Sequence, residues 1–245
     1  MPRLGVVVAS VREGRMGRPV ADWFIERARA HGHFEIDDVD LKEVNLPIFA
    51  ERHHPRLRQY ESDHQKAWSA RVASLDAFVF VMPEYNYSTA PALINALDYL
   101  LFEWSYKPLG LVTYGGISGG LRAAQMVKQT VSALKLVAIP EAVTIPFIAQ
   151  AIDKESGVFK ATDAHDKSAV TVLDELARWT TALASLRVQP RDRSCASRPA
   201  ARARRQQPRG ARGRHRRSGN PAHQRGCQSV DRQTACSGIR SCLSR

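Results

Sequence analysis

Three short segments of the chain combine glycine with polar or aromatic residues, and each follows an apolar run. They read SVREGRMG at residues 10–17, PEYNYS at residues 83–88 and TYGGISGG at residues 113–120. Serine, glycine and arginine at such a position can offer a hydroxyl, backbone N–H groups and positive charge to a phosphate. Tyrosine rings can flank a flat ligand, and glycines let the backbone approach it closely. These residue types suit a ligand that carries both a phosphate and a flat ring.

Each segment also has an interpretation that needs no ligand. The first can be a polar turn with solvated arginines, the second a loop in which tyrosines pack and Asn86 caps a turn, and the third a flexible connection. The first segment lacks both the dinucleotide fingerprint G-x-G-x-x-G and the P-loop pattern. The positions of the three segments in the fold must therefore decide between the two interpretations.

Alternating strands and helices are predicted around these segments. Patterns of buried strands occur at Leu4–Ala9, Phe34–Leu41, Ala77–Met82, Leu109–Tyr114 and Val137–Ile145. Apolar residues at helical spacing follow at 18–28, 63–73, 89–101, 121–134 and 164–186, with Ser88 or Thr89 as the expected N-cap of the third helix. This order predicts a doubly wound α/β domain with a flavodoxin-like, five-stranded parallel sheet and helices on both faces. Since the three segments follow the first, third and fourth strands, we expect them to meet in one crevice at the carboxyl edge of the sheet.

Charge and cysteine content divide the chain after residue 187. The net charge is +12, but residues 188–245 hold 15 of the 36 Lys and Arg residues and only 2 of the 24 Asp and Glu residues. All four cysteines also lie there, at Cys195, Cys227, Cys236 and Cys242. We therefore predict a domain over residues 1–187 and an Arg-rich, disordered tail over residues 188–245. The abrupt change in composition also resembles translation of a GC-rich sequence in a shifted frame.

With these elements in place, residues 3–187 resemble the NAD(P)H-dependent FMN reductases of the flavodoxin-like group, which include quinone, chromate and azo-dye reductases. The resemblance rests on S-x-R-x-G-R-x-G at 10–17, on PEYNYS at 83–88 with ALINALDYL at 92–100, and on YGGISGGLRA at 114–123. It implies that FMN is the cofactor and that NADPH or NADH is the reductant. Electrons would then pass to a small-molecule acceptor such as a quinone, a flavin, an azo or nitro compound, or a metal oxyanion.

The resemblance also implies which residues bind FMN. The phosphate would be held by Ser10, Arg12, Arg15, Met16 and Gly17. The flavin ring would be flanked by Pro83, Glu84, Tyr85, Asn86 and Tyr87, with Tyr114, Gly115 and Gly116 along its pyrimidine side. Two departures from many relatives are Ile94 in place of Lys, and Arg15–Gly17 in place of a stretch with Ser and Asn. Because the flavin carries the reaction in this family, no side chain is predicted to act as acid, base or nucleophile. No metal site is predicted either.

Two other functions are compatible with the sequence. One is a flavodoxin-type electron carrier without enzyme activity; the other is a polyanion or nucleic-acid binder that acts through the tail. A carrier usually docks through an acidic surface, which the nearly neutral residues 1–187 do not predict. The tail contains no aromatic residue and no C-x-x-C spacing, so it is expected to bind nucleic acid only non-specifically.

The sequence also bears on location and assembly. The N-terminal apolar run is too short for a signal peptide, and no run reaches the ~18–20 apolar residues of a membrane-spanning helix. We therefore expect a cytoplasmic protein. The resemblance implies a homodimer or homotetramer, and the apolar segment Tyr99–Trp104 is either part of an interface or part of the core.

Overall fold

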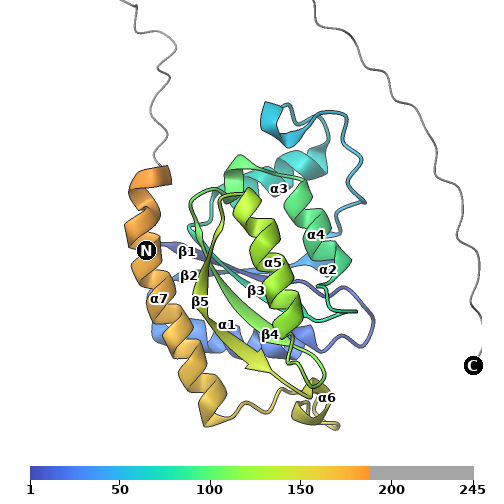
Figure 1. Cartoon of the computed structure of the whole chain (residues 1–245), viewed down its shortest axis with the longest axis vertical. Helices are drawn as coiled ribbons and strands as arrows, with labels where there is room; N and C mark the ends of the chain where they lie inside the picture. The colour runs from blue at the N-terminus through green and yellow to red at the C-terminus, as the bar shows by residue number, and fades with distance from the viewer. Residues whose placement is uncertain (188–245) are drawn as a thin grey trace, which may run out of the picture. The chain divides into compact units, whose positions relative to one another are not determined.

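The computed structural model describes residues 1–187 (Figure 1). The predicted Arg-rich tail, with its four cysteines, lies outside the described residues, so our expectations for it stay predictions. Within residues 1–187, no helix combines the length and the apolar character that a membrane crossing requires.

Five strands form one parallel sheet in the order β2-β1-β3-β4-β5. The strands are β1 Arg3–Val8, β2 Glu35–Asp40, β3 Ala77–Pro83, β4 Pro108–Tyr114 and β5 Val137–Ile145. This order is that of the flavodoxin-like fold, whose ligand crevice lies where the order reverses, between β1 and β3. The predicted fold class is therefore confirmed.

Seven α-helices and two 3-10 turns surround the sheet within the described part of the chain. The helices are α1 Gly17–His31, α2 Leu41–Val44, α3 Asp63–Ala73, α4 Pro91–Asp98, α5 Leu121–Ala133, α6 Ile148–Ala151 and α7 Asp163–Arg187, and the 3-10 turns are Pro55–Leu57 and Phe102–Trp104. Side chains of α1 and α7 pack on one face of the sheet, and those of α3, α4 and α5 pack on the other. Both faces are thus covered, as a parallel sheet requires.

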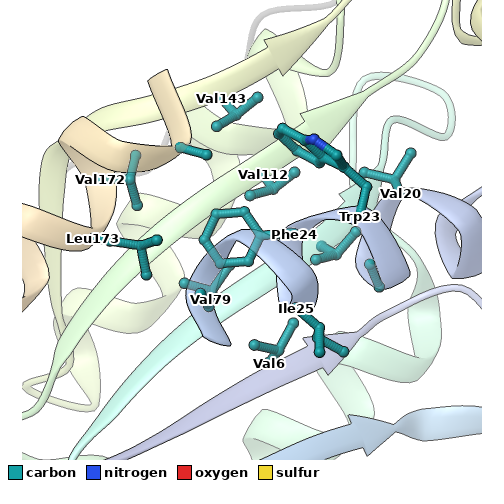
Figure 2. Close-up of a cluster of buried hydrophobic side chains, with 14 of the residues drawn as sticks. Val6, Val20, Trp23, Phe24, Ile25, Val79, Val112, Val143, Val172 and Leu173 are labelled. Atoms are coloured by element: carbon teal, nitrogen blue, oxygen red, sulfur yellow. The ribbon is translucent and has the colours of Figure 1, made fainter. Parts of the chain in front are cut away.

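The strands alternate their side chains between the two cores. Val79 and Val81 of β3 point into the core beneath α1 and α7, whereas Phe78 and Phe80 point into the opposite core. Figure 2 shows the first of these cores, in which Phe24 of α1 is surrounded by valines from the strands. Because both faces of β1, β3 and β4 are buried, these three strands read as nearly continuous apolar runs in the sequence.

Helix α4 begins later than the sequence pattern indicates. Its N-cap is Ala90, and Pro91 occupies the first turn. Within residues 1–187, the buried Thr89 hydroxyl has no hydrogen-bond partner, so the expected cap at Ser88 or Thr89 is wrong. The physical reason is Pro91, whose fixed φ and missing N–H suit the first helical position and restrict the residue before it.

One local feature at a strand end differs from the expectation, and a second lies within β5 at the proline that interrupts its sequence. The short helix α2 follows β2 directly, because the Asp40 side chain accepts the Lys42 N–H and caps it. In β5, the register with β4 shifts between Leu109 and Leu111. This irregularity lies opposite Pro140, which cannot donate a ladder hydrogen bond.

Candidate functional site

A cleft of about 210 Å³ lies where β1, β3 and β4 end. We call it the three-loop cleft, because its lining comes mainly from the first loop (residues 10–17), the second loop (83–88) and the third loop (113–120). The lining residues are Arg12, Gly14, Arg15, Met16, Pro83, Glu84, Tyr85, Tyr114, Gly115 and Ile148. Eight of the thirteen residues predicted to bind FMN are among them. The convergence expected from the strand order is therefore present.

A buried hydrogen bond joins the first and third loops beneath the cleft. The Tyr114 hydroxyl donates to Ser10 Oγ at 3.1 Å, and Ser10 is fully buried. A Cβ atom on Gly17 would lie 2.4 Å from both of these oxygens, so only glycine fits there. Burial raises the pKa of Tyr114 above its ordinary value, which keeps the hydroxyl protonated as a donor. The Ser10 and Tyr114 side chains thus join two strand ends instead of facing solvent.

Arg15 is held by a buried carboxylate. Its Nη1 and Nη2 atoms lie 2.5 and 2.6 Å from the two oxygens of Asp40, and Nη1 also donates to the Ser10 carbonyl at 2.7 Å. Burial by itself would raise the pKa of Asp40, but the hydrogen bonds from Arg15 and the Lys42 N–H lower it below its usual value. We expected Arg15 to offer free charge to a phosphate; the structure instead pairs it with Asp40.

Arg12, by contrast, has no ion-pair partner among residues 1–187. It is exposed, and its guanidinium carbon lies 5.6 Å from the centre of the Tyr85 ring. Met16 is the N-cap of α1 and, within the described residues, no side chain caps this helix. The first N–H groups of a helix carry partial positive charge and attract anions. The first loop therefore presents one unpaired arginine beside an uncapped helix start.

The second loop contains a tight reversal of the chain. Tyr85 and Ser88 exchange backbone hydrogen bonds of 2.8 and 2.9 Å, and Asn86 and Tyr87 between them have φ values of +49° and +67°. Two consecutive positive φ values define a type I′ turn, which is strained at a tyrosine. The turn separates the two tyrosines: Tyr85 lines the cleft, whereas Tyr87 is 69% exposed and stacks with Arg122 at 4.3 Å. Of the two tyrosines Tyr85 lines the cleft, and the expectation that both rings flank one ligand stays a prediction.

Glu84 connects the second loop to the start of α5. Its carboxylate accepts the Arg122 N–H at 3.1 Å and the Arg122 guanidinium at 2.8 Å, and its side chain is only 8% exposed. Burial would raise the pKa of Glu84, but hydrogen bonds from Arg122 and Ser118 lower it below the ordinary value. Glu84 thus caps a helix, which accounts for its position without any contact to a ligand.

The glycines of the third loop serve two different purposes. Gly119 and Gly120 have φ values of +60° and +89°, and a Cβ on either would come within 2.7 Å of a threonine side chain. The carbonyls of Gly115 and Gly116 accept hydrogen bonds from Ile148 and Phe147. A Cβ on Gly116 would meet open space, and within residues 1–187 nothing accepts its N–H. Gly116 therefore leaves a backbone donor available at the edge of the cleft.

Comparison with known proteins decides what this arrangement represents. Residues 2–150 match the family described as NADPH-dependent FMN reductase. The NAD(P)H-dependent FMN reductase C4B3.06c of Schizosaccharomyces pombe is 38% identical over 149 residues, which cover 59% of this chain and 74% of that protein. A protein named quinone reductase from Pseudomonas putida is 31% identical over 148 residues, covering 57% of this chain and 75% of that protein.

The chain belongs to the NADPH-dependent FMN reductase family. The family assigns it FMN as cofactor and NAD(P)H as reductant, in agreement with the expectation from the sequence. Among solved structures, FerB of Paracoccus denitrificans has a TM-score of 0.59 and 21% identity, and the match covers 74% of this chain and 98% of that chain. This likeness supports the flavodoxin-like fold of the reductase.

Two side-chain contacts that position loops of this reductase, one of them at the cleft, are not evident from the sequence. Asp40 holds Arg15, as described above. Asn95 of α4 accepts the Phe49 N–H and donates to the Pro47 carbonyl, each at 2.7 Å, and so fixes the loop after α2. The pattern Asp-Leu-Lys-Glu after the second strand is a helix-start signal that could have identified Asp40 as a cap. No local pattern reveals the contacts of Asn95, because its two partners lie 46 and 48 positions away in the sequence.

The Glu84 contacts lead to a prediction on stability. Glu84→Gln should lower the free energy of unfolding at pH 7 by about 1–3 kcal/mol, because a charged acceptor is lost from Arg122. The pKa of Glu84 in the fold lies below the ordinary 4.5. The stabilisation that the Glu84 carboxylate contributes is therefore complete above pH 4.5, and it is lost as the pH falls through the lower pKa that Glu84 has in the folded state. Urea unfolding over a range of pH should show the two proteins converging below pH 4.5.

The control is Glu175→Gln, which removes a pair between Glu175 and the exposed Arg178 of α7. We expect a change below about 1 kcal/mol, as for other surface pairs. A difference between wild type and Glu84→Gln that stays constant down to acid pH would contradict the assigned role.

Proposed function

We propose that this reductase binds FMN in the three-loop cleft and passes electrons from NAD(P)H to a quinone. The observation that carries this proposal is that Arg12, the uncapped start of α1 at Met16 and Gly115 line one cleft, with the Gly116 N–H next in sequence to Gly115. Together they offer donors for a phosphate at one end and for a polar ring edge at the other. FMN has both of these groups, so the donor set fits it.

The phosphate end would be held by the first loop. Arg12 supplies the positive charge, and the N–H groups from Gly14 to Gly17 supply donors at the start of α1. Gly14 has a φ of +63° and no atom within 4 Å of where its Cβ would be, so the backbone there is open to a ligand. Ser10 and Gly17 would contribute indirectly to phosphate binding, because they keep the first loop packed against the ring of Tyr114.

The ring end would be held by the second and third loops. Tyr85 and the backbone of Pro83 and Glu84 offer one wall, and Gly115 offers the other, with the Gly116 N–H as a donor beside it. At about 210 Å³ the cleft is below the ~300–1,000 Å³ of typical cofactor pockets. It would therefore enclose only part of the cofactor and leave one side of the ring accessible to reductant and acceptor. Asn86 and Tyr87 would lie at this open rim.

When bound, FMN supplies the electron transfer from NAD(P)H to the acceptor. None of the ten residues that line the cleft is His, Cys or Lys. The protein's own contribution is thus to bind and orient the cofactor and to keep one side of it open. A quinone is the proposed acceptor because a relative that shares 148 aligned residues with this chain is named quinone reductase. A flat, apolar quinone also suits an open site without charged catalytic groups.

The proposed activity can be tested on the purified full-length protein. Its visible flavin absorption should fall when NADPH is added without oxygen and return when a benzoquinone is added. Flavin absorption that does not respond to NADPH would favour an electron carrier. A colourless protein that takes up no added FMN would overturn the cofactor site.

A substitution in the first loop tests the phosphate end. Arg12→Ala should weaken FMN binding by about 1.5–3 kcal/mol, the range for hydrogen bonds to charged groups, as measured by quenching of flavin fluorescence. Arg56→Ala, in the exposed 3-10 turn Pro55–Leu57, is the matched control and should bind as the wild type does. Equal affinity of Arg12→Ala and the control would remove Arg12 from the site.

We also propose that the chain forms a homodimer through an apolar groove of about 740 Å³ between α2 and α4. Ile48 in this groove is 88% exposed, and the half-buried Ile94 lies beside it. The groove also carries Asp98 and Lys42, and Lys42 already pairs with Glu13 at 2.7 Å, so burial of the apolar side chains carries the proposed isologous contact. Segment Tyr99–Trp104 is a weaker candidate, because Tyr99, Leu100 and Trp104 are buried in the core.

Ile48→Asp tests this interface. It should convert the dimer to a monomer at micromolar concentration, as measured by size-exclusion chromatography with light scattering, because it places a charge in an apolar contact. Val158→Asp, at a side chain that is 60% exposed outside the groove, should leave the dimer intact. A monomeric wild type would contradict the proposal, as would a dimer that Ile48→Asp does not affect.

A further inference from the structure

We infer that Arg15 and Asp40 form a positioning pair that holds the first loop in its phosphate-binding shape, and that Arg15 does not itself contact the phosphate. This inference rests on the proposed FMN site. It assigns a role to Asp40, a residue outside the three loops, and it reverses the role that the sequence suggests for Arg15.

The geometry of Arg15 leaves little of its guanidinium for a ligand. Two nitrogens bind the two Asp40 oxygens side by side, and Nη1 uses its second hydrogen on the Ser10 carbonyl. Such a bidentate pair is the strongest and most directional contact that an arginine makes with a carboxylate. The side chain is only 13% exposed. Arg15 therefore ties the start of the first loop, at Ser10, to the end of β2.

Asp40 cannot follow Arg15 if the arginine moves toward a ligand. Its side chain is 2% exposed and also accepts the Lys42 N–H at 2.9 Å, which fixes it to the start of α2. Arg18 approaches Asp40 only to 3.5 Å and is engaged by Asp22 and Asp38 at 2.9 and 3.0 Å. Departure of Arg15 would leave a buried carboxylate without its main partner, which is strongly unfavourable.

The Arg15–Asp40 pair therefore determines which arginine is available to bind the phosphate. Of the three arginines in and next to the first loop, Arg15 and Arg18 are paired and Arg12 is not. With Ser10 and Arg15 anchored, the residues between them are held from both ends. Arg12 and the N–H groups near Gly14 are then presented toward the cleft before any ligand arrives, which limits the entropy lost on binding.

The test compares the variant Arg15→Gln with the charge-matched double variant Arg15→Gln/Asp40→Asn. For each full-length protein, the dissociation constants of FMN and riboflavin are measured by fluorescence quenching. Riboflavin has the same ring without the phosphate, so the ratio of the two constants isolates the phosphate end. Thermal unfolding of each protein without flavin reports the structural cost separately.

Arg15→Gln should weaken FMN binding at least about tenfold, because the buried Asp40 carboxylate then keeps only the 3.5 Å contact with Arg18 and the first loop loses its anchor. Riboflavin binding should change little. The double variant removes the unpaired charge and leaves two amides that can bond each other, so its FMN affinity should return to within about threefold of wild type. If Arg15 were a direct phosphate ligand, the double variant would stay as weak as Arg15→Gln, and that result would overturn the inference.

A second Asp–Arg pair, between β2 and α3, provides the matched control. Asp37 and Arg71 of α3 are joined at 2.6 Å, and the Asp37 side chain is 16% exposed, but neither residue touches the first loop. Arg71→Gln/Asp37→Asn should leave the ratio of FMN to riboflavin affinity unchanged, whatever it does to stability. A ratio altered as much as in Arg15→Gln would mean that any loosening of β2 affects the site, which contradicts a specific role for Asp40.

The design also separates this inference from the proposed function. If Arg15→Gln does not fold, the double variant alone decides: near wild-type FMN affinity supports the inference, and a tenfold loss overturns it. If the wild type binds FMN no better than riboflavin, the FMN site itself is wrong and the inference falls with it. A wild type that prefers FMN, together with a double variant that does not, would overturn only the role assigned to the pair.

Discussion

In this domain β1 pairs in parallel with β3, and β3 with β4, so that Val8, Val81 and Val112 lie side by side. The chain leaves all three strands at the same edge of the sheet, and the three loops meet there although residues 10 and 113 are far apart in sequence. Both faces of these strands are buried. A slip of one residue would exchange the side chains of the two cores, so the register is strongly specified. The cleft is thus a consequence of strand pairing.

Three polar contacts then turn adjacent loops into a site of defined shape. Tyr114 binds Ser10, Glu84 binds the start of α5, and Arg15 binds Asp40. In each contact at least one partner is almost fully buried, and each joins segments that belong to different strands. Two nearby carboxylates, Asp40 and Glu84, are paired with arginines in the process, and Glu13 of the first loop pairs with Lys42. Arg12 is then the arginine of the first loop that has no ion pair within residues 1–187.

Most of the fold could be predicted because its signals are local. Apolar runs of six residues indicated the strands at Leu4–Ala9, Ala77–Met82 and Leu109–Tyr114. Helix α3 is predicted at Asp63–Ala73, where the structure has it, and the order of elements implied the parallel sheet. The partners of charged residues could not be predicted, since Arg15 finds Asp40 across 25 positions and Glu84 finds Arg122 across 38. A sequence shows that such residues are charged and near a loop, but only the fold shows that they are already paired. The same holds for Tyr85 and Tyr87, which a type I′ turn directs to different sides.

A site built from backbone groups depends on the shape of the chain more than on the side chains that line it. Gly17, Gly119 and Gly120 are required because a Cβ would collide with neighbouring atoms, whereas Tyr87 and Asn86 lie exposed at the rim. Substitutions at buried contacts that never reach the ligand should therefore disturb cofactor binding more than substitutions at exposed rim positions. Asp40, Ser10 and Tyr114 therefore preserve the form of the cleft itself.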